Sequence, residues 1–347
     1  MPRPAPEPAS FPPVPASLIT GFLGSGKTTL LNALLTHPGM KDTAVIVNEF
    51  GEIGLDHLLI ESAFEDAVLL KSGCICCTVR GDLVDTIETL AARRQRGEIP
   101  PYNRLVIETT GLADPAPILA TLMEDEKLRK LVYLDRVVTT VDAVNALSQL
   151  DTHYESAKQA ALADRLVLTK TDLVSPAMRT EVEARLHAIN PWAPVLIAVQ
   201  GQIAPEILFS DAHVAESWNT RLEAASRLGP GHDDGHDHES GPEHLATAHG
   251  ITSFTLTHDA PVAWENLSAW LESLASLKGP DLLRMKGLVN VRGRSGPVSI
   301  NGVQHLFHPP RGLKSWPDAD RRTRIVFITH DIPREAVARS FAAALKN

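Results

Sequence analysis

The chain has 347 residues, 44% of them hydrophobic, so it is long enough for two domains that each bury a core. Its net charge of −9 argues against general binding of nucleic acid or anionic membranes, because like charges repel. Its longest apolar runs fall short of the roughly 18 residues that a membrane-spanning helix needs. We therefore expect neither a membrane nor a nucleic-acid partner.

Residues 1–15 are rich in proline, and we expect them to form a disordered tail. They lack the basic region and apolar stretch that mark a secretory signal. The chain has three cysteines, an odd number that does not suit a disulfide framework. A reducing cytoplasm is therefore the expected compartment.

Apolar runs alternate with helical patterns over residues 16–228, which we expect to form the first domain. Strands are expected at residues 17–20, 43–48, 67–70, 104–109, 136–141, 165–169 and 195–199, and helices at residues 27–36, 82–96, 116–123, 154–161 and 177–188. Most of these strands are continuous apolar runs, which is typical of strands covered on both faces. The pattern predicts an α/β fold with a doubly wound, mostly parallel sheet.

The composition changes after Leu228. Residues 229–250 are rich in glycine, histidine and acidic residues, and we expect them to form a flexible linker. Residues 251–347 are expected to form a smaller α+β domain. Its expected strands are residues 251–257, 282–292, 297–301 and 324–329, and its expected helices are residues 263–277 and 333–345.

A glycine-rich motif follows the first expected strand and matches the phosphate-binding pattern G-x-x-x-x-G-K-[ST]. Small residues let backbone N–H groups turn toward phosphates, and the helix beginning near Lys27 directs its positive end at them. Lys27 would reach the β- and γ-phosphates, and the Thr28 hydroxyl would bind Mg²⁺. The motif indicates a P-loop NTPase domain. Its predicted nucleotide-binding residues are Gly21, Gly24, Ser25, Gly26, Lys27, Thr28 and Thr29.

Carboxylates at or near strand ends are candidates for catalysis. Glu108 ends an apolar strand and is the expected acid that holds Mg²⁺ through water, while the Gly111 N–H would sense a γ-phosphate. Glu49 ends another such strand, and Asp56 follows in a glycine-containing loop. Both are candidates to position the attacking water or a metal, although a solvated loop carboxylate is an equally good interpretation of Asp56. The predicted catalytic residues are Lys27, Glu49, Asp56, Glu108 and Gly111.

The segment from Thr169 to Asp172 follows a late strand and indicates which base is bound. Asp172 can accept hydrogen bonds from both N1–H and N2–H of guanine, a pair of donors that adenine lacks. The Lys170 stem can lie flat over the base. The usual motif begins with asparagine, and here position 169 is threonine. The predicted nucleotide is therefore GTP, with Thr169, Lys170 and Asp172 at its base.

All three cysteines, Cys74, Cys76 and Cys77, fall within four residues. Three thiolates this close form a soft site suited to Zn²⁺, Cu(I) or a similar ion. They cannot close a tetrahedral shell, so a fourth ligand must come from elsewhere, which suits transfer more than structure. The alternatives are a redox pair of cysteines or three small buried apolar residues.

The expected linker offers a second set of metal ligands. His232, His236 and His238 alternate with carboxylates, and His244 and His249 follow. A flexible, ligand-rich segment of this kind suits capture or buffering of a divalent ion such as auxiliary Zn²⁺. A merely polar linker is the alternative.

Five segments together resemble the CobW-like GTPases, a family that includes zinc metallochaperones. They are ITGFLGSGKTTL at 19–30, VNEFGEIG at 47–54, GCICC at 73–77, ETTGLADP at 108–115 and TKTDL at 169–173. Two further segments, LRMKGLV at 283–289 and VQHLFH at 303–308, resemble the C-terminal domain of that family. The resemblance covers residues 14–345.

The resemblance implies a GTPase that binds Zn²⁺ at the three cysteines and transfers it to a client apoprotein under control of the nucleotide. It places the Mg²⁺ and phosphate roles on Thr28, Glu49, Glu108 and Gly111, and base recognition on Lys170 and Asp172. We expect a monomer or a dimer that depends on nucleotide or metal. Co²⁺ or iron, for cobalamin synthesis or maturation of a nitrile-hydratase-like enzyme, is an alternative cargo. Outside the family, a P-loop small-molecule kinase and a histidine-rich zinc buffer are the alternatives.

Overall fold

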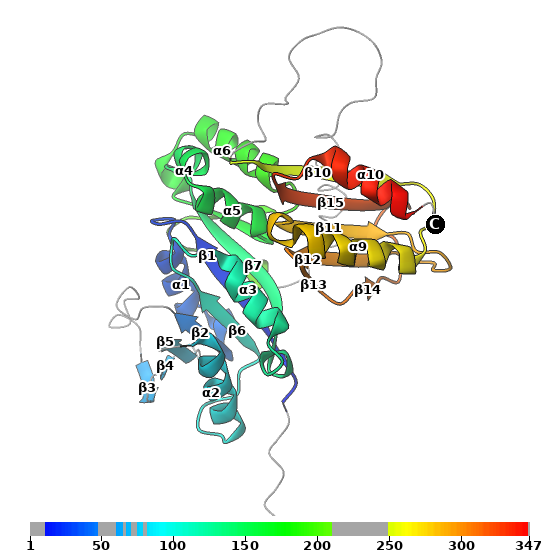
Figure 1. Ribbon diagram of the computed structural model, residues 1–347. Helices are drawn as coiled ribbons and strands as arrows, with labels where there is room; N and C mark the ends of the chain where they lie inside the picture. The colour runs from blue at the N-terminus through cyan, green and yellow to red at the C-terminus, as the bar shows by residue number, and fades with distance from the viewer. Residues whose placement is uncertain are drawn as a thin grey trace, which may run out of the picture. The chain divides into compact units, whose positions relative to one another are not determined.

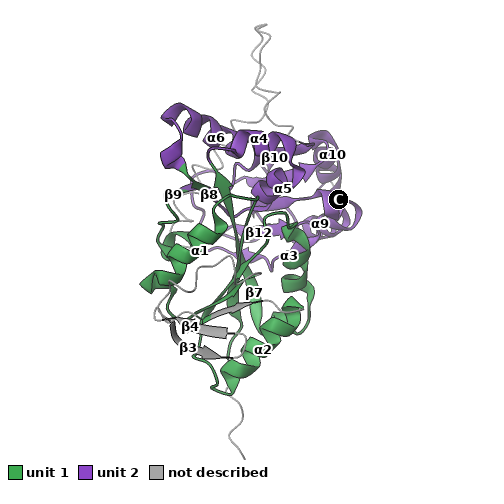
Figure 2. Cartoon of the chain, turned by 90° about the vertical axis from the view of Figure 1, so that its left-hand side faces the viewer, with its two compact units in different colours: residues 1–142, 167–170, 197–209 green, residues 143–166, 171–196, 210–347 purple. Residues whose placement is uncertain are grey.

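The computed structural model describes residues 11–47, 60–64, 67–70, 75–78, 82–209 and 249–345. Between residues 60 and 78 the only side chain described is that of Ile75. Contacts divide the chain into two units, coloured separately in Figure 2: residues 1–142, 167–170 and 197–209, and residues 143–166, 171–196 and 210–347. The units follow packing rather than chain order, and the domain limits expected from the sequence stay a prediction.

A nine-stranded sheet has the strand order β3-β4-β5-β2-β6-β1-β7-β8-β9. Its strands are β1 (Val14–Gly21), β2 (Thr43–Val47), β3 (Ile60–Phe64), β4 (Ala67–Leu70), β5 (Ile75–Thr78), β6 (Arg104–Glu108), β7 (Val132–Asp142), β8 (Arg165–Thr169) and β9 (Val195–Ala198). Strand β1 runs parallel to β6 and β7, and β2 runs parallel to β5 and β6. Strand β4 is antiparallel to both β3 and β5. The predicted α/β fold with a mostly parallel sheet is confirmed, and β3 and β4 add an antiparallel edge.

Helices cover both faces of this sheet in unit 1. Figure 2 shows α1 (Lys27–Thr36) on one side and α2 (Leu83–Gln95) and α3 (Pro115–Glu124) on the other. Covering on both faces explains the apolar strands: all five residues of β2 are buried. The Asp82 and Asp114 carboxylates cap α2 and α3 by accepting hydrogen bonds from backbone N–H groups of the first turn. Further helices in the described residues up to Phe209 are α4 (Ala146–Thr152), α5 (Tyr154–Leu162), α6 (Pro176–Ile189) and α7 (Pro205–Phe209).

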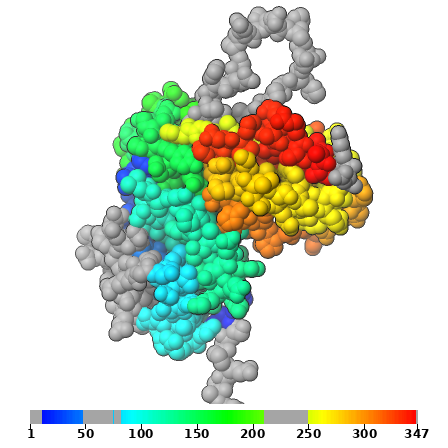
Figure 3. Space-filling model, viewed as in Figure 1, coloured from blue at the N-terminus to red at the C-terminus, as the bar shows by residue number. Residues whose placement is uncertain are grey.

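The C-terminal part of unit 2 is an antiparallel sheet of six strands with the order β10-β15-β11-β12-β13, in which β14 pairs with β12. Its strands are β10 (Ile251–His258), β11 (Arg284–Val289), β12 (Val298–Val303), β13 (Leu306–Phe307), β14 (Arg311–Gly312) and β15 (Thr323–His330). Helices α9 (Trp264–Lys278) and α10 (Arg334–Ala344) lie on one face, where their gold and red atoms cover the strands in Figure 3. This arrangement is the α+β layout expected from the sequence.

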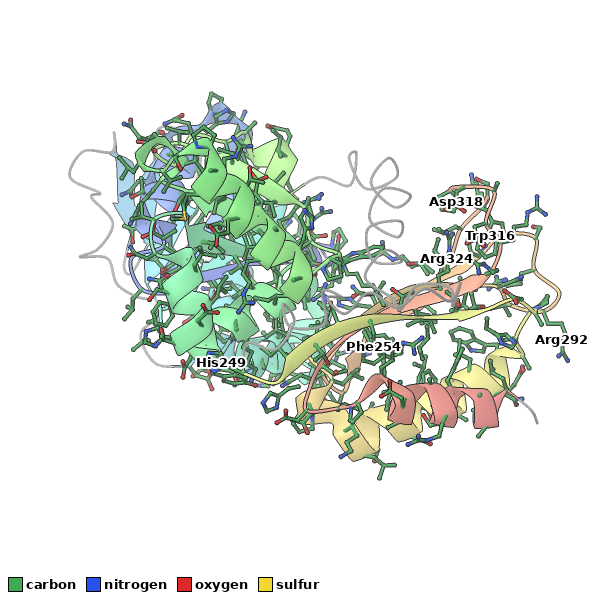
Figure 4. The ribbon with its side chains drawn as sticks, turned by 90° about the horizontal axis from the view of Figure 1, so that it is seen from above. His249, Phe254, Arg292, Trp316, Asp318 and Arg324 are labelled. Atoms are coloured by element: carbon green, nitrogen blue, oxygen red, sulfur yellow. The ribbon has the colours of Figure 1, made fainter. Side chains whose placement is uncertain are left out.

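The core of this part lies between the sheet and the two helices. Trp270 of α9 packs edge-on against Phe327 of β15 at 6.1 Å between ring centroids, and Phe254 of β10 stacks on Phe327 at 5.5 Å. At the other end of the sheet, Arg324 donates hydrogen bonds to both carboxylate oxygens of Asp318 (Figure 4). The apolar layer packs β15 against the helices, and the charge pair holds the segment that leads into β15 against the first residues of the strand.

Most expected elements are found within one or two residues, and the exceptions have physical reasons. Strand β5 was not expected, because ICCT is short and its cysteines indicated a metal loop. Strand β7 begins four residues before the expected start, since its first residues alternate between buried and exposed instead of forming an apolar run. Strand β11 is shorter than expected, because the chain leaves the sheet after Val289, and Val291 forms only an isolated bridge to Val262 before a turn. Within the described ranges, no helix combines the length and apolarity that crossing a membrane requires.

Candidate nucleotide site and metal motif

The predicted phosphate loop joins β1 to α1 and curves through three glycines with positive φ. These are Gly21 at 145°, Gly24 at 71° and Gly26 at 88°. At Gly21 a side chain is also excluded by space, since a Cβ atom would lie 2.3 Å from Oγ1 of Thr140 and 2.4 Å from its carbonyl oxygen. Gly21 is therefore required by space as well as by its backbone conformation, and the positive φ of Gly24 and Gly26 favours glycine there. The loop is followed directly by the N-terminus of α1, which is the positive end of the helix dipole.

Lys27 is the first residue of α1, and its side chain is buried, with 8% exposed. Its ammonium group donates hydrogen bonds to the carbonyl oxygens of Gly21 at 2.8 Å and Phe22 at 3.3 Å. The lysine therefore curls over the loop that it belongs to. Its positive charge sits where the phosphate-binding pattern requires it.

A set of buried hydroxyl groups supports the loop from neighbouring strands. The hydroxyls of Ser25 and Thr140 are hydrogen-bonded at 2.7 Å, and Thr140 also donates to the carbonyl oxygen of Thr20 at 3.3 Å. Thr109 donates to the Thr20 hydroxyl at 2.9 Å. These bonds join the ends of β1, β6 and β7 and hold the phosphate loop in one conformation.

The predicted Mg²⁺ ligands supply suitable atoms. Thr28 offers a hydroxyl in the first turn of α1, and Glu108 offers a carboxylate at the end of β6, where 9% of the residue is exposed. In the sheet Glu108 pairs with Ile19, two residues before the phosphate loop begins. Hydroxyl and carboxylate oxygens are hard donors of the kind that Mg²⁺ prefers. The donor set fits the ion.

Gly111 lies against the phosphate loop. A Cβ atom on Gly111 would lie 2.9 Å from both N and Cα of Leu23, so only glycine permits this approach. The loop after β6 therefore touches the phosphate loop through Gly111, and its role as a γ-phosphate sensor stays a prediction.

The predicted base motif follows β8. The Thr169 hydroxyl donates to the carbonyl oxygen of Ser25 at 2.8 Å and lies 3.2 Å from that of Val141. Lys170 has a left-handed backbone, with φ of 55°, which is uncommon outside glycine. Its ammonium donates to the carbonyl oxygen of Gly24 at 2.8 Å and to the Asp142 carboxylate at 2.8 Å. The motif is thus tied to the phosphate loop at two points, and Asp172 follows in an exposed 3₁₀ turn.

The strand that carries two of the cysteines belongs to the same sheet as the phosphate loop. Cys76 and Cys77 of β5 pair with Val45 and Ile46 of β2. Ile46 pairs in turn with Ile107 of β6. Cys77 therefore lies level with the residue before Glu108, two strands away, which is about 10 Å between backbones.

Comparison with family models matches residues 15–197 to the CobW/HypB/UreG nucleotide-binding domain and residues 251–345 to the cobalamin synthesis protein cobW C-terminal domain. The chain belongs to the CobW/HypB/UreG family. The resemblance inferred from the motifs is confirmed by this match.

Individual relatives align with nearly the whole of this chain. The zinc chaperone YjiA of Escherichia coli is 34% identical, and the alignment covers 96% of this chain and 99% of YjiA. The zinc chaperone CobW of a Sinorhizobium species is 31% identical over 95% of this chain and 97% of its own length. Among solved structures, the Zn(II)-bound YjiA GTPase of E. coli matches with a TM-score of 0.75 at 32% identity, covering 96% of this chain and 99% of that one.

Several predicted site residues lie outside the described part of the chain. These are Glu49, Asp56, Cys74, His232, His236 and His238, and the side chains of Cys76 and Cys77 are also undescribed. Thr29 is described and exposed on α1. Among the described residues, no group of three histidine, cysteine, aspartate or glutamate side chains could hold a metal ion. The metal ligands named from the sequence therefore stay predictions.

Thr140 and Asp142 were not predicted as site residues. Thr140 contacts Ser25 of the phosphate loop, and Asp142 contacts Lys170 of the base motif. A signal was present: both lie at the carboxyl end of an expected parallel strand, the edge where ligands bind in open α/β sheets. Neither belongs to a recognised motif, so only their position in the sheet marks them.

Proposed function

We propose that this protein is a GTP-hydrolysing metallochaperone that binds Zn²⁺ and transfers it to client apoproteins. The observation that carries the proposal is the register of β5. It sets the strand bearing Cys76 and Cys77 in one sheet with the phosphate loop and Glu108, close to the edge where a nucleotide would bind. Relatives that align over nearly the whole chain are named zinc chaperones.

The nucleotide half of the proposal assigns each described residue a task. Lys27 exchanges its bonds to Gly21 and Phe22 for bonds to the β- and γ-phosphates, where its charge offsets the charge that develops during hydrolysis. Water attacks the γ-phosphorus, the bond to the β–γ bridging oxygen breaks, and GDP and phosphate leave. Mg²⁺, held by Thr28 and through water by Glu108, would supply charge neutralisation across these phosphates.

Base recognition falls to Lys170 and Asp172. The carboxylate of Asp172 accepts hydrogen bonds from N1–H and N2–H of guanine, and the Lys170 stem covers the face of the ring. Support comes from the two bonds that tie Thr169 and Lys170 to the phosphate loop, since they set the base and phosphate sites at a fixed spacing. Glu49 and Asp56 remain candidates to position the attacking water.

The metal half assigns Zn²⁺ to the thiolates of Cys74, Cys76 and Cys77, with the fourth position left for another ligand or for the client. Strand β2 separates the cysteine strand from β6, and residues 48–70 connect β2 to the cysteines along the chain. A γ-phosphate that orders this connection would tighten the thiolate site, and hydrolysis would loosen it. Release to the client then follows GTP hydrolysis.

The deciding experiment measures Zn²⁺ affinity by competition with a chromophoric chelator, with GDP or with a non-hydrolysable GTP analogue bound. We expect affinity to be about tenfold tighter with the analogue, within the usual range of allosteric coupling. The variant C76S/C77S should lose this difference. A deletion of residues 231–249 should keep it, whereas a histidine-rich buffer would lose most of its capacity. Equal affinities in the two nucleotide states would contradict the coupling.

A further inference from the structure

Asp142, the last residue of β7, stands outside every motif and is buried, with 1% exposed. Its carboxylate accepts a hydrogen bond from the Lys170 ammonium at 2.8 Å. The same ammonium donates to the carbonyl oxygen of Gly24 at 2.8 Å. Asp142, Lys170 and the phosphate loop therefore form one connected cluster.

Burial makes this carboxylate an effective anchor. A buried charge is costly unless a partner of opposite charge stays in place, so Asp142 favours the conformation in which Lys170 reaches it. The left-handed backbone of Lys170 turns its side chain back from β8 toward the loop. The two hydrogen bonds hold the ammonium at the end of the Lys170 side chain, while 38% of the side chain remains exposed. A stem held in this way offers a flat apolar surface next to the phosphate loop.

We propose that Asp142 is a positioning residue for nucleotide recognition: it fixes Lys170 so that the lysine stem forms a preorganised platform for the guanine face. The inference rests on the proposed function, in which Lys170 and Asp172 contact the base. Thr169 supports the same assembly, because its hydroxyl is committed to the backbone of Ser25. The base-side contacts then depend on Lys170, which is oriented by a residue from a different strand.

The test uses the full-length protein and titration of a fluorescent GDP analogue into wild type and the near-isosteric variant D142N. We expect D142N to bind about tenfold more weakly, the order of one charge-assisted hydrogen bond. Because Asp142 acts through Lys170, adding D142N to K170M should cause no further loss. The matched control is D151N, which removes an aspartate that pairs with Arg185 on the surface and should bind GDP like wild type.

Wild-type affinity of D142N, or losses that add up in the double variant, would overturn the inference. Melting temperatures of the nucleotide-free proteins separate a binding defect from misfolding. If D142N does not fold, K170M and the charge-balanced variant K170M/D142N decide. Equal GDP affinities in these two variants, both about tenfold below wild type, support the platform, and a further loss in the double variant excludes it.

A second titration separates this inference from the proposed function. Xanthine carries a carbonyl where guanine carries its 2-amino group, so D172N should shift the preference from GDP toward XDP. Without that shift, the assignment of Asp172 to the base fails. If D172N shifts the preference and D142N leaves GDP affinity unchanged, only the role of Asp142 fails. D142N itself should leave the GDP-to-XDP ratio unchanged, because the lysine stem does not contact the 2-substituent.

Discussion

Two aspartates on either side of the segment 143–163 each hold a lysine, but their surroundings differ. Asp142 has 1% of its side chain exposed, and its partner Lys170 has 38% exposed. Asp164 has 13% exposed, and it pairs with Arg284, which has 2% exposed, and with Lys286, which has 16% exposed. Around Asp142 the lysine side chain is partly open to solvent, and around Asp164 both cationic side chains are largely enclosed.

The difference indicates that the residues around Asp142 serve ligand binding and the residues around Asp164 serve folding stability. A partly exposed lysine stem can exchange water for a ligand at little cost, as the proposed role of Lys170 requires. The enclosed cations of the Asp164 cluster have given up their hydration, so they depend on protein groups. Arg284 also donates to the carbonyl oxygen of Leu162, which ties the end of α5 to β11 of the C-terminal sheet within unit 2. Substitution of Asp164 should therefore lower the free energy of unfolding. Substitutions around the phosphate loop should instead lower GDP affinity or the rate of GTP hydrolysis.

The largest effect is expected for Asp164→Ala. It removes the carboxylate between Arg284 and Lys286 and leaves two enclosed positive charges close together. Breaking such a pair costs about 3–5 kcal/mol of unfolding free energy. Denaturant unfolding of the full chain measures the loss, and GDP affinity of the folded fraction should stay at the wild-type value.

Asp259→Ala is the control for this substitution, because Asp259 pairs with Arg322 at the surface, where the two side chains are 88% and 50% exposed. Exposed pairs contribute about 0–1 kcal/mol, so this variant should unfold like wild type. Equal unfolding free energies for the Asp164 and Asp259 variants would remove the distinction between the enclosed and the exposed pairs.

Lys27→Met should have the next largest effect, on catalysis rather than folding. Methionine fills the space of the stem but removes the ammonium that lies on Gly21. Loss of one preorganised charge in a phosphoryl-transfer site costs about 10²–10³-fold in kcat, or roughly 3–4 kcal/mol. Phosphate release under saturating GTP measures it, with the melting temperature as the check on folding. A kcat within tenfold of wild type would contradict the assignment of Lys27.

Elements that are specified by local sequence were predicted accurately. Helix α1 was predicted with its observed limits, because the loop-to-helix motif specifies where it begins. The apolar strands around Ile107 and Val167 were predicted to within a residue, since continuous apolar runs survive in any parallel sheet. These features depend on local sequence, and local sequence was sufficient.

Contacts between residues far apart in the chain could not be predicted from the sequence. Thr140 and Asp142 lie more than 100 residues from the phosphate loop in the chain and meet it only through strand order. Thr169 was expected at the base, and its hydroxyl lies on Ser25, a contact that no spacing rule indicates. Asp164 drew no attention because a lone aspartate before a strand has no motif, and its partners lie about 120 residues away.

Thr169→Val sharpens the comparison at the nucleotide site. Valine keeps the shape of threonine but removes the hydrogen bond to Ser25, leaving a buried carbonyl oxygen without its donor. Such a loss costs about 1–3 kcal/mol, here as weaker GDP binding because the phosphate loop loses a tether. Isothermal titration measures it. Thr169→Ser, which retains the hydroxyl, should bind within about twofold of wild type, and an equal loss in both variants would point to packing instead.

The smallest effect concerns pH and the Asp164 cluster. Burial, followed by the positive charge of Arg284, lowers the pKa of His308 to about 4, against 6.5 for a free histidine; Lys286 and Arg311 act in the same direction and Asp164 opposes them. The folded protein therefore favours neutral His308. The stability that this preference provides is complete above pH 6.5 and is lost as the pH falls from 6.5 toward 4. Between pH 7 and pH 5 the loss should be about 1–2 kcal/mol.

Unfolding free energies of wild type and His308→Gln at pH 7 and pH 5 test this prediction. Glutamine has no proton to gain in this range, so the variant should lose less stability on acidification by about the amount that His308 contributes. His305→Gln is the matched control, because His305 lies three residues earlier and is exposed. If His308→Gln and His305→Gln respond alike to pH, burial and the charge of Arg284 do not lower the pKa of His308, and the surroundings of His308 are more open to water than the structure indicates.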